Sequence, residues 1–434
     1  MSISNIGLGL LALVLSVPSA LFAQSPADLQ RLAVLEDRSK PSGRKIELAY
    51  ALLKSTAATP GSPIVYLDGG PGGSGVGLYR VEEYRRLFDA MRAAGDVILL
   101  SQRGTGFSTP RLTCAGKAHA PADLFVSAKR MIDALTPRVV ACGDELRGKG
   151  IDLDAYNTEA SADDLEDLRK AIGAPKISLF GFSYGTHLAL TMVRRHPASI
   201  DRVILAGTEG PDHTQKLPHT FDLQLARLAF FESPTSDLVE VTHAVMATLD
   251  RSPVQAGGLT IGKEGFQYLL RRDIGDTNDT ANLIKMIRDA AKRDYGMLGK
   301  LAARRHAELN GGMAIMPFAM DCASGVTSER LARINRELPT SALGVMTNFP
   351  FPFVCDALQI TTLPDAFRAP IVSTLPVLFI SGTLDSNTPP YQAEEVRWGF
   401  PNSTHLVIEN AGHESTLPRP DVQRAIVDFL KSSR

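Results

Sequence analysis

A serine between two glycines lies at a predicted junction of strand and helix. Residues 181–185 read Gly-Phe-Ser-Tyr-Gly and match the pattern Gly-x-Ser-x-Gly. The apolar run Ile177–Phe180 precedes them and a helical stretch follows. A sharp turn there needs small residues beside Ser183 and leaves its hydroxyl above the sheet, near a helix dipole that favours negative charge. We predict Ser183 as a nucleophile, the alternative being an incidental serine in a glycine-rich turn.

A serine hydroxyl is a poor nucleophile until a base takes its proton. His413 follows the apolar run Leu406–Ile408 by a short glycine-containing loop, and Asp385 follows Val377–Ile380 in the same way. A carboxylate in that position can hold the tautomer of the imidazole and stabilise the imidazolium. We therefore predict that Ser183, Asp385 and His413 form a catalytic triad.

Other side chains could compete for the role of base or of its orienting acid. His405 begins a predicted strand, which favours a structural role, and His213 lies where it could line a hinge. His187 and His196 lie on or beyond the helix that follows the nucleophile, and helical geometry points them elsewhere. Glu414 directly follows the predicted base, and an adjacent residue is poorly placed to orient it.

A glycine-rich loop, residues 68–75, follows the predicted strand Ile64–Leu67. Glycines allow the backbone to approach a ligand closely. We predict that the Gly70 and Tyr184 N–H groups form an oxyanion hole, in which each donor is worth about 3 kcal/mol. The loop lacks the Gly-Lys-Ser/Thr ending of a P-loop and the spacing of a dinucleotide motif, which argues against phosphate binding.

The elements that must position these residues alternate between strand and helix. Alternation of this kind predicts an α/β fold with a mostly parallel central sheet and helices on both faces. Short apolar runs rich in β-branched residues predict the strands Ile64–Leu67, Val97–Leu100, Ile177–Phe180, Val203–Leu205, Val377–Ile380 and Leu406–Ile408. Helices are predicted at Asp163–Ile172, Gly185–Arg195 and Val422–Leu430.

The alternation stops after Leu205 and returns at Pro376. Between them the sequence is mainly helical, as in Thr220–Phe231, Leu238–Leu249 and Asn282–Arg305, which predicts an inserted helical cap. The predicted division is a signal peptide at 1–23, a first core part at 24–208, the cap at 209–369 and a second core part at 370–434.

Composition and the N-terminus bear on the partners and the compartment. The 434 residues carry a formal net charge of −1, which gives no support for a nucleic-acid or membrane-surface partner. The apolar run Ile6–Val17 is short for a membrane span and fits a signal peptide cleaved near Ala23. No Lys or Arg precedes it, so an uncleaved anchor or a buried helix are alternatives. We expect an exported chain, periplasmic or secreted, without stable membrane insertion.

The four cysteines fit export. Four cysteines allow three disulfide connectivities, and pairing of sequence neighbours in an oxidising compartment gives Cys114–Cys142 and Cys322–Cys355. Free buried thiols are the alternative. No Cys-x-x-Cys pair or histidine at zinc-finger spacing occurs, so we expect no metal site.

Together these motifs resemble the prolyl aminopeptidase and tripeptidyl aminopeptidase branch of the α/β-hydrolases, in its exported subgroup. The resemblance rests on the loop 68–72 (family His-Gly-Gly-Pro-Gly), residues 101–108 (family Asp-Gln-Arg-Gly-x-Gly-x-Ser), the turn 181–186, Asp385 with Thr388-Pro389, and the cap segments 319–322 and 353–355. Asp68 replaces the family's His and Ser101 its Asp. Charge alone suggests that Asp68 pairs with Arg103.

The resemblance implies a serine peptidase that releases residues from peptide N-termini through an acyl-enzyme, without a cofactor or metal. Such an enzyme must bind a free ammonium, and carboxylates near the cap would do so best. Glu209 is the first candidate, and Asp212 and Asp321 are others. An esterase or small-molecule amide hydrolase with the same triad, or a catalytically silent binding protein, are the competing hypotheses. The sequence predicts a peptide or small-molecule substrate and does not indicate an oligomeric state.

Overall fold

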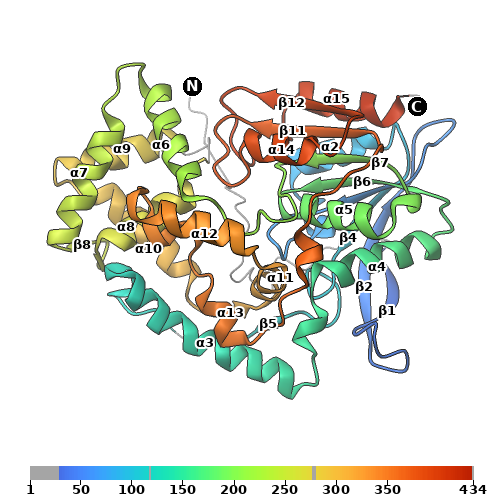
Figure 1. The fold of residues 1–434 in the computed structure, drawn as a ribbon, viewed down its shortest axis with the longest axis horizontal. Helices are drawn as coiled ribbons and strands as arrows, with labels where there is room; N and C mark the ends of the chain where they lie inside the picture. The colour runs from blue at the N-terminus through green and yellow to red at the C-terminus, as the bar shows by residue number, and fades with distance from the viewer. Residues whose placement is uncertain (1–28, 117–118, 276–279, 433–434) are drawn as a thin grey trace.

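A computed structural model describes residues 29–116, 119–275 and 280–432 (Figure 1). The predicted signal peptide lies outside these residues. The chain forms an eight-stranded sheet in the order β1-β2-β4-β3-β6-β7-β11-β12. Its strands are β1 (Leu29–Leu35), β2 (Lys45–Leu53), β3 (Ile64–Leu67), β4 (Val97–Ser101), β6 (Ile177–Phe182), β7 (Ile200–Ala206), β11 (Val377–Gly382) and β12 (Ser403–Ile408).

Pairing within the sheet is parallel from β4 through β12 and antiparallel for β1–β2 and β2–β4. The six predicted strands are all present, which confirms the α/β architecture with a mostly parallel sheet. Each central strand is buried on both faces, as its unbroken apolar sequence requires. The β1–β2 hairpin was not predicted, because polar residues such as Gln30, Arg31, Lys45 and Glu47 interrupt its apolar residues.

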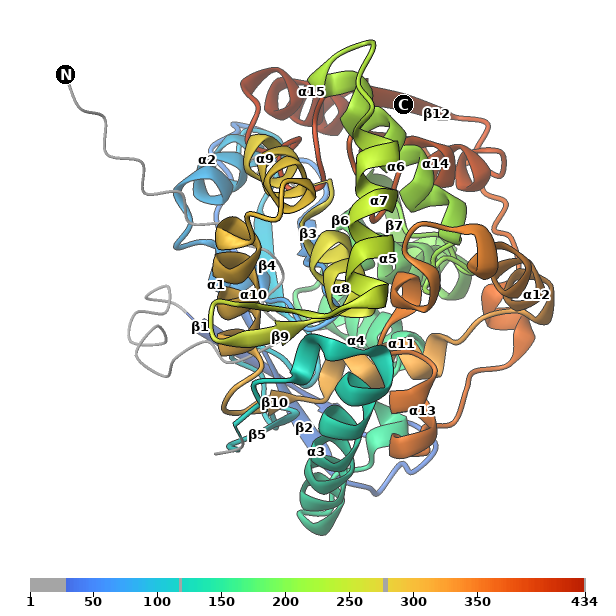
Figure 2. The same cartoon turned by 90° about the vertical axis from the view of Figure 1, so that its left-hand side faces the viewer.

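Helices cover both faces of the sheet, as Figure 2 shows. Side chains of a strand alternate between faces, so Val65 and Leu67 enter the cluster around α4 and α5, whereas Ile64 and Tyr66 enter the cluster around α2 and α15. These helices are α2 (Glu82–Met91), α4 (Thr158–Ala171), α5 (Tyr184–Arg195) and α15 (Pro420–Lys431), and α14 (Pro390–Arg397) lies between β11 and β12.

Helices and one short hairpin fill the chain between β7 and β11, and Figure 1 shows them gathered beside the sheet. They are α6 (Pro218–Glu232), α7 (Leu238–Arg251), β8 (Val254–Ala256), β9 (Leu259–Ile261), α8 (Lys263–Asp273), α9 (Thr280–Ala291), α10 (Gly296–Glu308), α11 (Met316–Ser324), α12 (Ser328–Glu337) and α13 (Phe353–Leu358). We refer to this group as the cap. Phe125 and Met131, from before α4, share its hydrophobic cluster.

The helical pattern Asn282–Arg305 is divided in the structure between α9 and α10. Arg293 adopts a left-handed φ of 65°, and the side chain of Asp294 accepts a hydrogen bond from the Gly296 N–H at 3.0 Å. This local turn competes with the helix, as aspartate side chains commonly do.

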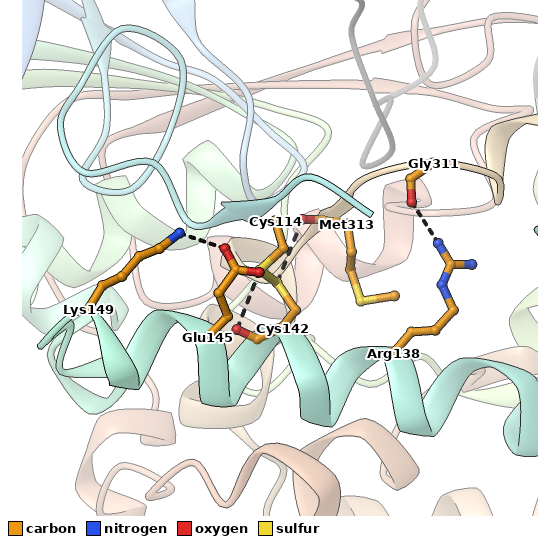
Figure 3. The surroundings of a disulfide bond; sticks show 7 residues. All are labelled: Cys114, Arg138, Cys142, Glu145, Lys149, Gly311 and Met313. Carbon is orange, nitrogen blue, oxygen red and sulfur yellow. Dashed lines mark hydrogen bonds and ion pairs between the residues drawn. A yellow bond between two sulfur atoms is a disulfide. The ribbon is translucent and has the colours of Figure 1, made fainter. Parts of the chain in front are cut away.

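Two disulfides join distant parts of the chain. Cys114 of β5 (Thr113–Cys114) bonds to Cys142 of α3 (Ala128–Gly148), 28 residues away, and Cys322 of α11 bonds to Cys355 of α13, 33 residues away. Figure 3 shows the first disulfide with Arg138 of the same helix, which donates to the Gly311 carbonyl at 2.9 Å. In the described residues no helix is long and apolar enough to cross a membrane.

The second disulfide should contribute measurably to stability. Replacing Cys322 and Cys355 together with alanine should lower the free energy of unfolding by about 3 kcal/mol, because a loop of this length gains conformational entropy in the unfolded chain. Urea unfolding followed by circular dichroism measures the difference. The matched Cys114→Ala, Cys142→Ala variant should behave similarly, and an unchanged unfolding midpoint in both variants would contradict the expectation.

Candidate active site

Ser183 lies in the turn between β6 and α5, with a backbone of φ 54° and ψ −127° that non-glycine residues rarely adopt. Its N–H donates to the Ala206 carbonyl of β7 at 2.9 Å. The turn is so tight that a Cβ on Gly185 would lie 1.9 Å from the Leu67 carbonyl oxygen. A Cβ on Gly181 would lie 2.4 Å from the Gly185 oxygen. The two glycines of the motif are therefore required sterically.

The predicted triad residues meet in the structure. His413 Nε2 lies 2.9 Å from Ser183 Oγ, and His413 Nδ1 lies 2.8 Å from Asp385 Oδ2. Asp385 follows β11 and His413 follows β12, so both loops leave the same carboxyl edge of the sheet as the turn that carries Ser183. When Nδ1 of His413 carries the proton and donates a hydrogen bond to Asp385, Nε2 is unprotonated and can accept a hydrogen bond from the Ser183 hydroxyl. The arrangement can accept a proton from the serine hydroxyl.

Asp385 is held ionised by its surroundings. Its Oδ1 accepts hydrogen bonds from the N–H groups of Asn387 and Thr388 at 2.8 and 2.9 Å, and its Oδ2 accepts one from Thr388 Oγ1 at 2.7 Å. Burial opposes ionisation, but His413 and these hydrogen bonds outweigh it and hold the pKa of Asp385 below its usual value. Burial also lowers the pKa of His413, yet the Asp385 carboxylate raises it to about 8.

The cap directly contacts the loops that carry Asp385 and His413. The His413 N–H donates to the Gly275 carbonyl at 3.2 Å, and Ser386 Oγ donates to the Ile274 carbonyl at 2.6 Å, just beyond α8. Gln224 of α6 donates from Nε2 to the Asp385 carbonyl at 2.8 Å. These residues are far apart in the sequence and carry no motif, so sequence reasoning missed them.

The glycine-rich loop packs against Ser183. A Cβ on Gly69 would lie 2.7 Å from Ser183 Cβ, and Gly70 has a φ of 118° that favours glycine. Neither the Gly70 nor the Tyr184 N–H donates a hydrogen bond within the described part of the chain. Tyr184 begins α5, so its N–H has no acceptor inside the helix. The pair predicted as an oxyanion hole thus has donors available.

The predicted pairing of Asp68 with Arg103 is wrong. Arg103 binds Asp164 of α4 instead, with Nε–Oδ2 and Nη2–Oδ1 distances of 2.8 and 2.7 Å, and its Nη1 donates to backbone carbonyls. Asp68 accepts hydrogen bonds from the Gly69 N–H at 2.9 Å and from Tyr66 at 3.5 Å. Burial raises the pKa of Asp68 to about 6.

The other weighed side chains have partners elsewhere. His187 contacts the Gly210 carbonyl, His196 contacts Asp163, His213 contacts Glu395, His405 contacts Glu394 and Ser381, and Glu414 accepts from Tyr84. Within residues 29–116, 119–275 and 280–432, no three His, Cys, Asp or Glu side chains converge in a way that could hold a metal ion.

The three candidate carboxylates differ in their partners. Glu209 is buried and forms an ion pair with Lys216 Nζ at 2.9 Å. Burial opposes its ionisation, but Lys216 outweighs burial and lowers the pKa of Glu209. Asp212 accepts from the N–H and Oγ1 of Thr327 at 2.9 and 2.5 Å, at the start of α12. Asp212 thus holds Thr327, whose hydroxyl caps that helix by accepting from the Arg330 N–H.

Asp321 is the candidate carboxylate without a partner. Among the described residues its side chain makes no hydrogen bond or ion pair, although it is only partly exposed. Burial and the nearby Glu209 hold the pKa of Asp321 well above its usual value. Its helix, α11, crosses the first turn of α5: the Tyr184 hydroxyl lies 3.3 Å from Met320 Sδ, and His187 Nε2 lies 3.3 Å from Ser324 Oγ.

Three curated relatives align with less than half of the chain. They are the serine protease Hip1 of Mycobacterium tuberculosis (28% identical, 42% of this chain), the tripeptidyl aminopeptidase of Streptomyces lividans (28%, 43%) and the proline iminopeptidase of Arabidopsis thaliana (28%, 38%). The aligned stretch covers only 36%, 36% and 31% of their own lengths.

Two family profiles match the parts of the chain that hold the candidate site. The profile described as alpha/beta hydrolase fold matches residues 62–254, which include Ser183. The profile described as TAP-like protein matches residues 347–434, which include Asp385 and His413. These matches agree with the parallel sheet and its order of strands. The chain therefore has the α/β-hydrolase fold, and its C-terminal part is similar to the TAP-like proteins.

Proposed function

We propose that this chain is an exported serine peptidase that releases residues from the N-termini of peptides through an acyl-enzyme on Ser183. The observation that carries the proposal is the continuous hydrogen-bonded chain from Ser183 Oγ through His413 to Asp385. The names of the relatives, serine protease, tripeptidyl aminopeptidase and proline iminopeptidase, support peptide substrates. Two disulfides support an oxidising compartment and thus export.

The proposed reaction follows from the order of these groups. His413 Nε2 takes the proton of Ser183 as its oxygen attacks the scissile carbonyl, and Asp385 stabilises the resulting imidazolium. The Gly70 and Tyr184 N–H groups donate to the oxyanion of the tetrahedral intermediate. His413 then protonates the leaving amine, and water hydrolyses the acyl-enzyme by the same proton transfers in turn.

Recognition of the peptide's free ammonium falls, in this proposal, to Asp321 rather than to Glu209. Lys216 already neutralises Glu209, whereas the Asp321 carboxyl has no partner within the described residues. A substrate ammonium beside Asp321 would favour its ionised form and supply the missing hydrogen-bond donor.

An esterase or small-molecule amide hydrolase is the second candidate. One observation favours it: the Lys216 ammonium lies within 2.9 Å of Glu209, so a cation occupies the place where an aminopeptidase needs negative charge. The same Ser183, His413 and Asp385 would perform ester hydrolysis unchanged, since the fold accepts many substrates. A requirement for a free amine separates the two candidates.

The first test is hydrolysis of aminoacyl- and tripeptidyl-aminomethylcoumarins, each with a free and an acetyl-blocked N-terminus. We expect turnover of the free-amine substrates only, and a loss of about 10⁴-fold or more in kcat for Ser183→Ala, because the nucleophile is gone. Labelling of the wild type, but not the variant, by a fluorophosphonate provides the control. Cleavage of simple esters alone would favour the esterase, and an unlabelled wild type would exclude both enzymes.

The pH dependence of activity should follow His413. The ring must be neutral to take the Ser183 proton, so kcat/KM should rise with pH and level off above about pH 8. p-Nitrophenyl acetate, which has no titrating amine, is the suitable substrate. In Asp385→Asn the main group that raises the pKa of His413 is gone while burial remains, so the rise should move to lower pH. The rate should fall by about 10⁴-fold.

An NMR titration of the His413 imidazole in both proteins checks that displacement independently of turnover. Asp421→Asn, an exposed carboxylate paired only with Arg419, serves as the matched control. If kcat/KM rose at the same pH in Asp385→Asn as in the wild type, the assignment of this carboxylate as the partner of His413 would be contradicted.

Asp321→Asn tests recognition of the ammonium. The variant should raise KM for free-amine coumarins by about tenfold, the usual worth of a charge-assisted hydrogen bond, and leave hydrolysis of p-nitrophenyl acetate unchanged. Asp356→Asn, on the exposed side of α13, is the control. Equal losses on both substrates would indicate a structural role for Asp321, and unchanged kinetics on both would remove it from the binding site.

A further inference from the structure

Arg271 in the cap has no contacting carboxylate among the described residues, just as Asp321 has no contacting cation there. Arg271 of α8 donates from Nε to the Thr347 carbonyl at 2.7 Å, and its guanidinium lies 5.7 Å above the centre of the Phe221 ring. In the part of the chain that the structure describes, its four remaining N–H bonds have no hydrogen-bond or ion-pair partner. The side chain is nevertheless partly exposed, so its free edge meets open space.

Arg271 is tied closely to the catalytic loops. It lies one turn before Ile274 and Gly275, whose carbonyls accept from Ser386 and from the His413 N–H. Its acceptor Thr347 adjoins Asn348, whose side chain exchanges two hydrogen bonds with the Lys216 backbone at 2.7 and 2.8 Å. Thr347 and Asn348 thus connect Arg271 to the backbone of Lys216, whose side chain pairs with Glu209.

Desolvation raises the free-energy cost of leaving the Arg271 guanidinium without a counterion. Desolvation by its surroundings, reinforced by Arg272, lowers the pKa of Arg271 to about 10. Two buried arginines of this chain have carboxylate partners: Arg103 binds Asp164, and Arg305 binds Asp273 at 2.5 Å and Glu308 at 3.0 Å. An unpaired buried charge is unfavourable, and an arriving anion relieves that cost.

Among the described residues, Asp321 and Arg271 each lack a contacting group of opposite charge. Glu209 and Lys216 neutralise each other, while Asp321 and Arg271 interact only at a distance without contact. Ser183 and His413 are likewise partly exposed. A ligand that carries both an ammonium and a carboxylate would satisfy both unpaired groups at once.

We propose that Arg271 binds a carboxylate of the substrate, which makes acidic or short free-acid peptides the preferred class. The planar guanidinium over Phe221 leaves a fork of N–H groups suited to bidentate contact with a carboxylate. An acidic side chain and the C-terminus of a short peptide offer the same chemistry. The inference rests on the proposed peptidase function and extends it to the class of substrate.

Binding tests the proposal without turnover. Isothermal titration calorimetry on Ser183→Ala would compare Ala-Gln-Ala-amide, which has no carboxylate, with Ala-Glu-Ala-amide and with Ala-Gln-Ala as the free acid. We expect at least one of the two carboxylate peptides to bind about tenfold more tightly than Ala-Gln-Ala-amide. Tighter binding of Ala-Glu-Ala-amide would indicate an acidic side chain as the source of the carboxylate, and tighter binding of the free acid would indicate the C-terminus. Adding Arg271→Gln should reduce that preference to less than about twofold.

Two further variants serve as controls for the binding measurement on Arg271→Gln. Lys263→Gln removes a positive charge at the exposed start of the same helix and should leave the preference intact. Arg271→Lys keeps the charge without the planar fork and should bind carboxylate peptides with intermediate affinity. It also serves if Arg271→Gln does not fold, as judged by circular dichroism.

The outcomes separate this inference from the proposed function. Equal affinity for all three peptides, or a preference that survives Arg271→Gln, would overturn the carboxylate site even if the wild type is an active peptidase. A carboxylate preference that depends on Arg271 in a protein that hydrolyses no peptide would leave the site standing and sink the peptidase proposal alone.

Discussion

The close approach of backbone segments around Ser183 is the constraint on which the candidate site depends. Gly69, Gly181 and Gly185 each stand where a Cβ would collide with neighbouring atoms, at 1.9 to 2.7 Å. These contacts allow the chain to turn within one residue and hold Ser183 at a φ of 54°, a conformation that costs of order 1–3 kcal/mol. The fully buried strands β3 and β6 on either side supply the stability that sustains it.

The same edge of the sheet explains why the other site residues converge. In a parallel sheet every carboxyl end lies on one edge, so loops after β6, β11 and β12 meet there. The cap then completes the arrangement, since carbonyls after α8 bind the His413 N–H and the Ser386 hydroxyl. The candidate site is thus an interface between the core and the cap, and the disulfide between Cys322 and Cys355 stabilises the cap helix that carries Asp321.

Sequence reasoning worked where the signal is local. Continuous apolar runs identified β3, β4, β6, β7, β11 and β12, and a few residues between each strand and its loop placed Ser183, Asp385 and His413 near one another. Sequence reasoning did not find hydrogen-bond and ion-pair partners that are distant in the sequence, and it assigned a wrong partner to Arg103 where charge was the only argument. Asp164 takes Arg103 because α4 packs beside it, which no spacing indicates. The Gly275 contact with His413 spans more than a hundred residues and uses only backbone atoms.

The carboxylates show most clearly what a sequence withholds. As residue types, the three candidate carboxylates are equally able to bind an ammonium, and their contacts distinguish them. Glu209 pairs with Lys216, Asp212 accepts from Thr327, and Asp321 has no partner among the described residues. A group whose partner is already present contributes to the folded state, whereas a group left unpaired in a desolvated place lowers stability until a ligand arrives. Asp321 and Arg271 are of the second kind, with opposite signs. The free-energy cost of leaving Asp321 and Arg271 unpaired is the physical reason to expect that these two groups, rather than Glu209, recognise the substrate.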